Sequence, residues 1–298
     1  MRALFAPLTA HPSRRQHQDM NFIAARPAQI LAPLAQLSPQ RAQGRLDLAF
    51  AHDGRTRLDR FYQQGCLKAR LPRGPGVEVV ALNISGGIAG GDRLETALEL
   101  APHAEVTFTT QAAERIYRAL EAPAYVRTRL SAHAGTVLHY LPQETILFDG
   151  FGLDRGLDID LAGDAAFLGV ESLVFGRLAM GEALREGFLR DRITLRRDGV
   201  LVWQDSTRID GDIAAVLDRP GVAAGGRAMA SMFATGPGVA ARLDDLRAAL
   251  GDAHAGASWT GEIVLARILA PDAASLRRIV SRALAVMRQG PLPRVWQS

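Results

Sequence analysis

With 298 residues the chain is long enough to bury a large core, as one β domain or two smaller domains, and its 48% hydrophobic content is ordinary for a soluble globular protein. The formal net charge is only +4 and the basic residues are scattered, so the clustered basic surface that nucleic acids require is not expected. The single cysteine, Cys66, excludes an internal disulfide and a multi-thiolate metal site, and is typical of a reducing compartment.

Residues 1–40 contain repeated prolines and lack a regular hydrophobic period. We therefore predict a poorly ordered N-terminal extension over 1–40 and one β-rich domain over 41–298. The apolar stretch near the N-terminus is short and broken by Pro7, unlike the hydrophobic region of a secretory signal. Because the sequence also has no apolar run as long as a membrane span, we expect a cytoplasmic protein that does not contact a membrane.

A glycine-dense turn over 86–92 lies between two segments that alternate as β-strands do. A phosphate-binding loop would precede a helix, and its P-loop form would carry Gly-Lys-Ser/Thr; this turn does neither. The glycines are therefore predicted to connect two strands, where φ is positive or backbones approach closely. Further alternating segments predict strands over 77–82, 94–100, 105–110, 125–131, 136–141, 157–161, 167–174, 188–196, 200–209 and 259–269.

Arg197-Asp198-Gly199 joins two of these strands and predicts a hairpin. Near the C-terminus, one apolar stripe predicts a helix over Val239–Leu250, and a second helix is expected over Asp272–Arg288 with Asp272 as its N-cap. The fold class is therefore all-β, with an irregular β-helical or sandwich-like body and two helices near the C-terminus.

The sequence contains no Gly-x-Ser-x-Gly nucleophile motif, and its seven histidines form no His-x-His or His-x-x-x-His pair. Four carboxylates beside turns remain as candidates, Asp92, Glu144, Asp149 and Glu182. Two interpretations stay open. Such acids cap turns or pair with nearby arginines, or they form a transient path for a divalent cation, since oxygen ligands hold nickel weakly enough to release it.

Four segments carry a family resemblance in the same order and at similar separation: the turn over 86–92, Thr109–Arg118, Leu141–Gly150 and Gly176–Glu182. Together they closely resemble the urease accessory protein D family, UreD, also called UreH. Weaker matches include the ending Pro293-Arg294-Val295-Trp296, and the resemblance covers residues 42 to 298.

The resemblance implies a β-helical body and a non-catalytic metallochaperone subunit that helps insert nickel into the urease apoprotein. It implies binding to that apoprotein and to UreF, which recruits the GTPase UreG. The chain has no nucleotide-binding motif, so GTP hydrolysis would belong to a partner. No tightly bound cofactor is expected, and nickel would be handled transiently. The alternative hypothesis is a β-helical enzyme acting on a polymer, with Glu144 and Asp149 as paired acids.

Overall fold

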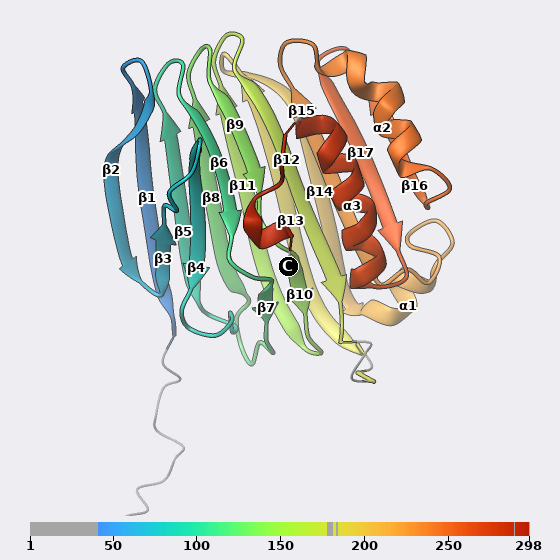
Figure 1. Cartoon of the computed structure of the whole chain (residues 1–298). Coiled ribbons are helices and arrows are strands. Elements are labelled where there is room, and N and C mark those ends of the chain that lie inside the picture. The colour runs from blue at the N-terminus through green and yellow to red at the C-terminus, as the bar shows by residue number, and fades with distance from the viewer. Residues whose placement is uncertain (1–40, 178–180, 183, 289, 298) are drawn as a thin grey trace, which may run out of the picture. The chain divides into compact units, whose positions relative to one another are not determined.

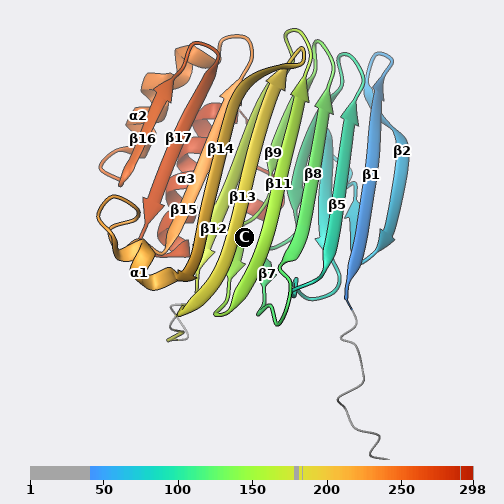
Figure 2. The same ribbon diagram turned by 180° about the vertical axis from the view of Figure 1, so that it is seen from behind.

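In a computed structural model, residues 41–177, 181–182, 184–288 and 290–297 are described; the predicted extension over 1–40 lies outside them. Two β-sheets lie face to face (Figures 1 and 2). Within the described residues, sheet A has seven strands, in the spatial order β14 (Val200–Asp212), β13 (Glu186–Arg197), β11 (Phe151–Leu161), β8 (Ala124–Ala132), β5 (Arg93–Leu100), β1 (Gln43–His52) and β2 (Thr56–Gly65).

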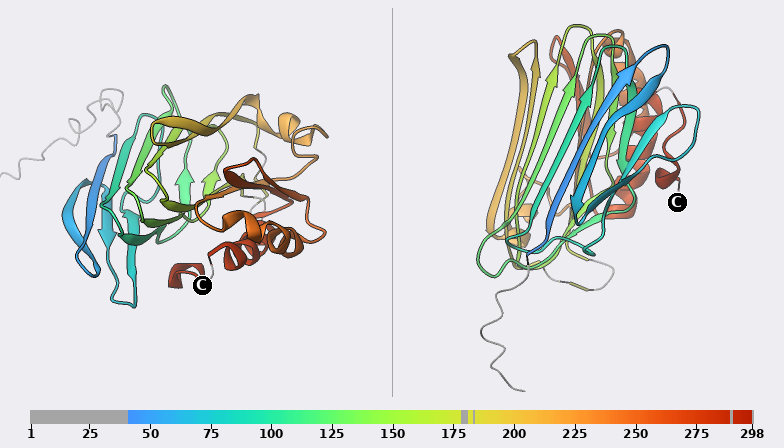
Figure 3. Two further views of the ribbon diagram at one scale, coloured as in Figure 1. Left: turned by 90° about the horizontal axis from the view of Figure 1, so that it is seen from above. Right: turned by 90° about the vertical axis from the view of Figure 1, so that its left-hand side faces the viewer.

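Sheet B packs against sheet A and carries the helices α2 and α3 on its outer face (Figure 3). Its main path is β16 (Ala255–Trp259), β17 (Ile263–Ala270), β15 (Ala228–Thr235), β12 (Ala166–Phe175), β9 (Val137–Leu141), β6 (Glu105–Thr110), β4 (Val77–Asn83) and β3 (Leu67–Arg70). The helices are α1 (Ile213–Asp218), α2 (Leu243–Leu250) and α3 (Ala273–Arg288), with short 3-10 turns η3 (Val239–Arg242) and η4 (Arg294–Trp296).

The chain winds as a β-solenoid, passing from sheet B to sheet A and back. Within sheet A, β1, β5, β8, β11 and β13 are parallel neighbours, and within sheet B, β4, β6, β9 and β12 are parallel neighbours. Each coil therefore contributes one strand to each sheet. Antiparallel hairpins close the two ends of sheet A, β1 with β2 and β13 with β14.

A short third side links the sheets at one end of the coils. It consists of an isolated bridge at Ile88, β7 (Glu114–Ile116), β10 (Thr145–Leu147) and the last residues of β12. Ile88, Ile116, Leu147 and Phe175 stack along it, one from each coil, and each is at most 2% exposed. Ile88, Ile116 and Leu147 belong to three of the four resemblance segments, so these three segments lie side by side on the third side.

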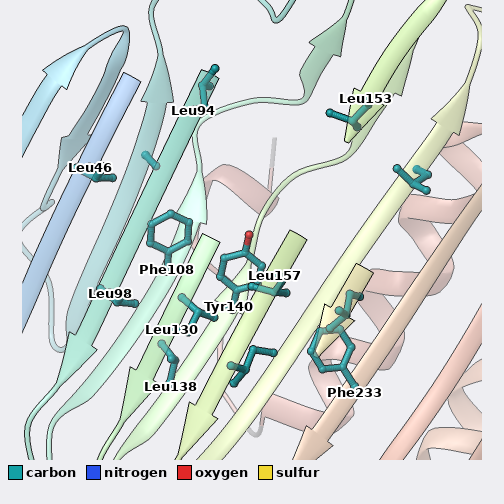
Figure 4. Packing of buried hydrophobic residues seen from close by; sticks show 14 of the residues in the cluster. Leu46, Leu94, Leu98, Phe108, Leu130, Leu138, Tyr140, Leu153, Leu157 and Phe233 are labelled. Carbon is teal, nitrogen blue, oxygen red and sulfur yellow. The ribbon is translucent and has the colours of Figure 1, made fainter. Parts of the chain in front are cut away.

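Two apolar layers hold this arrangement together. The first lies between the sheets, where leucines and aromatic rings from both sheets interdigitate (Figure 4). The second lies between sheet B and the helices α2 and α3. Strand β12 contributes to both layers, which is why nine of its ten residues are buried rather than every second one.

The structure confirms the all-β class and both predicted helical regions, although the first begins as the 3-10 turn η3. Asp272 caps α3, since its Oδ1 accepts a hydrogen bond of 2.8 Å from the Ser275 amide. Asp198 and Gly199 both have positive φ in the predicted hairpin. Two predictions were wrong: residues 259–269 are not one strand but the end of β16 and most of β17, separated by a turn at Gly261, and the short helix α1 was not expected.

The segment after α3 folds back onto sheet B and buries Trp296. Its indole Nε1 donates a hydrogen bond of 3.0 Å to the Leu141 carbonyl, and the Arg277 guanidinium lies 5.0 Å from the ring centroid. Arg277 also donates to Gln143 and Glu144. The resemblance segment that begins at Leu141 is therefore a socket for the C-terminal tryptophan.

Replacing Trp296 by Ala is expected to lower the free energy of unfolding by about 3 to 5 kcal/mol, because it removes a buried aromatic ring and leaves a cavity. Urea denaturation measures the change. Trp259, which is 38% exposed, provides the matched control, and Trp259→Ala should cost about 1 kcal/mol or less. Equal losses for the two variants would contradict the socket.

Candidate functional site

A chamber of about 270 Å³ lies between the sheets beside the third side of the solenoid, and a few polar side chains lie within its mostly apolar lining. Its walls come from both sheets and include Tyr140, Arg155 and Glu171 in its interior. It reaches the surface at Gly86 and Gln111, both exposed, so its mouth is formed by resemblance segments. Sequence analysis assigned none of the four candidate carboxylates to such a space, and none of them is among the residues that line it.

A buried arginine and one of its two carboxylate partners line the inner wall of the chamber, and the second carboxylate lies behind them. Arg155 on β11 pairs in register with Asp191 on β13, and its Nε and Nη2 donate to the two Asp191 oxygens at 2.9 and 2.6 Å. Its Nη1 reaches across to sheet B and donates to Glu171 Oε2 at 2.6 Å. The side chains of Arg155, Glu171 and Asp191 are 11%, 7% and 10% exposed. This triad therefore ties the two sheets together away from bulk water.

One guanidinium charge balances only one of the two carboxylates. Asp191 holds both of its oxygens against Arg155, whereas Glu171 receives a single bond from it. Burial raises the pKa of Glu171 to about 7, because Arg155 offsets the desolvation of the carboxylate only in part and Asp191 repels its negative charge. Burial lowers the pKa of Arg155, but the two neighbouring carboxylates outweigh this effect and hold the pKa above its ordinary value.

A tyrosine and a second carboxyl complete the polar lining. The Tyr140 hydroxyl is hydrogen-bonded to Glu171, and Figure 4 shows this ring among the leucines of the inter-sheet layer. Nearer the mouth, Asn83 Nδ2 donates to Glu114 Oε2 at 3.2 Å. Burial raises the pKa of Glu114, while the bond from Asn83 acts in the opposite direction. The chamber thus offers two carboxyls with raised pKa values, one near each end of its lining.

The glycine turn shapes the mouth, as a strand connection with positive φ at Gly86, Gly87 and Gly91. At Gly87, a Cβ atom would lie 2.3 Å from the Tyr117 ring and 3.0 Å from the Arg115 carbonyl oxygen. The positive φ and the close approach of the Tyr117 ring and the Arg115 backbone therefore both favour a glycine at this position.

Replacing Glu171 by Gln should flatten the pH dependence of stability. The pKa of Glu171 is about 7 in the folded protein, whereas the ordinary pKa of a glutamate is 4.5. Raising the pH through this window therefore disfavours the folded state. The native protein should lose about 2 to 3 kcal/mol more than Glu171→Gln between these limits. Urea unfolding at several pH values measures this difference.

An exposed carboxyl supplies the control for that series. Glu95 lies on the solvent-facing side of β5, so Glu95→Gln should leave the pH dependence of the native protein unchanged. A Glu171→Gln variant with the native pH slope would show that folding does not raise the pKa of Glu171, contrary to the balance of charges described above.

The structure separates Asp92 and Glu144 from each other. Asp92 is 4% exposed and caps the glycine turn, since its two oxygens accept from the amides of Ala42 and Ala89 at 2.7 and 2.8 Å. Glu144 forms an ion pair of 3.0 Å with Arg277 in the tryptophan socket. Both carboxylates therefore have structural partners.

Asp149 and Glu182 are brought together. The Asp149 amide donates to Glu182 Oε1 at 3.3 Å, and each acid pairs with an arginine, Asp149 with Arg118 and Glu182 with Arg177, both at 3.0 Å. Burial raises the pKa of Asp149, but hydrogen bonds from the Arg185 and Glu186 amides outweigh this effect and hold the pKa below its ordinary value. Since Glu144 and Asp149 are held by different partners, the structure gives no support to their use as an acid–base pair.

The four carboxylates predicted from the sequence include neither Glu171 nor Asp191, and Arg155 was not predicted as a site residue. Within the described residues, no group of three or more His, Cys, Asp or Glu side chains is placed to hold a metal ion. Cys66 is buried, and burial raises the pKa of its thiol, as expected of a small apolar residue. None of the described helices has the length and apolar character needed to cross a membrane.

The fold and the site define a β-solenoid protein with a chamber between its sheets that is lined by residues from three of the four sequence segments. Over residues 42–297 the chain matches the family described as UreD urease accessory protein. It is 47% identical over 262 residues to the urease accessory protein UreD of Xanthobacter autotrophicus, covering 86% of this chain and 90% of that protein.

Two further relatives carry the same name. Urease accessory protein UreD of a Methylobacterium species is 44% identical over 271 residues, covering 87% of this chain and 96% of that protein. The UreD of a Chelativorans species is 42% identical over 275 residues, covering 90% and 98%. The chain therefore belongs to the UreD family of urease accessory proteins, as the four segments indicated.

Proposed function

We propose that this chain is the metallochaperone subunit that helps insert nickel into the urease apoprotein. In this proposal it acts in the cytoplasm in a complex with UreF, through which it meets the GTPase UreG, and it delivers nickel to the urease apoprotein. It is not itself an enzyme and binds no cofactor tightly. Nickel is its cargo.

The observation that carries the proposal is the convergence of the family's segments on the mouth of the chamber. Three of these segments supply the third side of the solenoid, and they include Gly87, Glu114 and Gln143 among the residues that line the chamber. A chamber with oxygen donors suits a divalent cation in transit, because carboxyl, carbonyl and hydroxyl oxygens bind nickel more weakly than a cage of histidine or cysteine does.

Two sets of carboxyls are candidates for contact with the ion. The first is the set predicted from the sequence: Asp92, Glu144, Asp149 and Glu182. Of these, Asp149 and Glu182 lie together beside the third side and so form the best local pair of the set. The second set consists of the chamber residues Glu114 and Glu171. The two sets define different routes and require separate variants.

Amide substitutions distinguish a metal route from a structural role. Asp149→Asn and Glu182→Gln keep a carbonyl oxygen that accepts the backbone bonds but lose the charge that attracts a cation. If the acids guide nickel, the paired variant should yield urease with less nickel while its melting temperature stays near that of the native protein. The same measurement on Glu114→Gln with Glu171→Gln tests the chamber.

The matched control is Glu262→Gln. Glu262 forms an exposed ion pair with Arg197 and lies among neither set of candidates. Native nickel content in urease matured with both paired variants would contradict a carboxylate route for the cargo. A fall in nickel content that follows only a fall in melting temperature would assign the acids to turn caps and ion pairs.

A further inference from the structure

An aromatic and cationic ridge runs across the outer surface of the third side. It consists of Tyr117, Phe148 and Arg177, one residue from each of three successive coils. The Tyr117 and Phe148 rings meet edge to face with centroids 5.2 Å apart, and the Arg177 guanidinium lies over the Phe148 ring at 4.3 Å. The Tyr117 hydroxyl donates to the Gly86 carbonyl at 3.1 Å. The ridge is therefore preorganised by contacts along its whole length.

Its residues face outward because their neighbours face inward. Ile116 and Leu147 are 1% and 0% exposed in the inter-sheet layer, so the following residues, Tyr117 and Phe148, emerge on the opposite side of the strands. Tyr117 is 37% exposed and the Arg177 side chain 46% exposed. Aromatic and arginine side chains held in one patch are the residues that most often anchor protein interfaces.

The charge that the ridge presents to solvent is positive. Arg177 pairs with Glu182 and Arg118 pairs with Asp149, but the carboxylates lie behind the guanidinium groups. The Arg118 side chain is 60% exposed and that of Asp149 is 24% exposed, while the Glu182 side chain is only 13% exposed. Arg115 adds a further exposed cation at the mouth of the chamber. The exposed guanidinium groups therefore favour a partner that supplies negative charge.

We propose that the ridge is a docking surface for a partner protein that presents an apolar side chain flanked by carboxylates. This inference rests on the proposed function, because it places a partner of the nickel-delivery complex over the mouth of the chamber. The apolar group would pack on the Tyr117 and Phe148 rings and the carboxylates would meet Arg115 and Arg177. A second copy of this chain does not fit, since a two-fold contact would set like charges against each other.

Binding of purified UreF and of purified urease apoprotein to the full chain, measured separately, tests the proposal. Tyr117→Ala should weaken binding to one of these two proteins by about tenfold or more, the size expected for an interface anchor. Tyr117→Phe, which keeps the ring, should retain native affinity. Arg115→Glu should weaken the same complex and reduce the salt dependence of its association.

Arg57→Glu is the matched control. Its side chain is 49% exposed, close to the value for Arg177, but Arg57 is the second residue of β2. The hairpin before β2 lies at the end of the strands opposite to β7 (Figure 1). This variant should bind both proteins as the native chain does. If Tyr117→Ala fails to fold, Arg115→Glu still tests the proposal. Arg115 is exposed, so the Arg115→Glu variant should keep the melting temperature of the native protein.

Native affinity of Tyr117→Ala and Arg115→Glu for both proteins would overturn the docking surface, and so would self-association of the native chain that Tyr117→Ala abolishes. In either case nickel delivery by the native chain would still stand. If the native chain binds both proteins at the ridge but leaves urease without nickel, the surface stands and the proposed function fails.

Discussion

Replacing Arg155 by Met is expected to lower the free energy of unfolding by about 3 to 5 kcal/mol, the loss typical of removing one partner from a buried ion pair. The methionine fills most of the space, so the loss arises from charge rather than volume. Asp191 and Glu171 would remain buried, 8% and 6% exposed, without the cation that both now contact. Urea denaturation at pH 8, where Glu171 is ionised in the native protein, should show the largest effect.

An exposed arginine on the neighbouring strand provides the control. Arg190 on β13 pairs with Asp154 at 3.2 Å, but its side chain is 51% exposed, so Arg190→Met should cost about 1 kcal/mol or less. Adding Asp191→Leu and Glu171→Leu to Arg155→Met should recover most of the loss, because an apolar replacement of a buried ion cluster removes its desolvation penalty. A loss that persists in this triple variant would show that packing, not charge, explains the effect.

The strands of this fold follow from local pattern, whereas their arrangement does not. Alternation identified the strands that became β5, β6 and β9, because one face of each meets the inter-sheet layer and the other does not. The coils of the solenoid differ in length, so the sequence contains no repeat of fixed length. Thr96, Thr128, Leu157 and Ile193 are paired neighbours in successive coils, and the unequal steps between them reflect inserted turns of different length on the third side.

The turn between β16 and β17 shows the limit of pattern alone. Residues 259–269 were predicted as one strand because apolar residues continue on both sides of Thr260-Gly261-Glu262. The Gly261 φ of 93° instead reverses the chain into an antiparallel pair. Helix α1 was missed because its six residues are too few for a helical period to emerge, although Asp212 caps it through the Ala215 amide.

The alternating pattern of two strands contained a signal for the buried triad of Arg155, Glu171 and Asp191. Arg155 falls in phase with Leu153, Leu157 and Ile159, the inward residues of β11. In the same way Asp191 falls in phase with Leu189 and Ile193 on β13. A charged residue at an apolar phase in two strands indicates a buried pair, but the parallel register that makes them neighbours comes from the fold.

The residues next to the four predicted carboxylates in the sequence indicated some of their structural partners. Their position beside turns explains why Asp92 caps one, and the Gly176 segment supplied Arg177 as the partner of Glu182. The distant partners were not visible in the sequence. Arg277 reaches Glu144 from α3, a helix far along the chain that packs on sheet B.

Loss of this protein from a urease-positive host is expected to leave the urease subunits present but nearly without nickel and nearly inactive. Purified native chain should hydrolyse neither urea nor GTP, because the proposed function assigns nickel insertion to the complex and GTP hydrolysis to UreG. Restoring the chain on a plasmid should restore both nickel content and activity, which separates a role in maturation from an effect on expression of the subunits.

Nickel bound per purified urease, compared between the host lacking this chain and the same host carrying it, is the most direct measurement of the central claim. The account predicts little nickel without the chain and full occupancy with it, at equal amounts of urease subunits. Full nickel occupancy in urease from the host that lacks the chain, with no other change in the host, would contradict it.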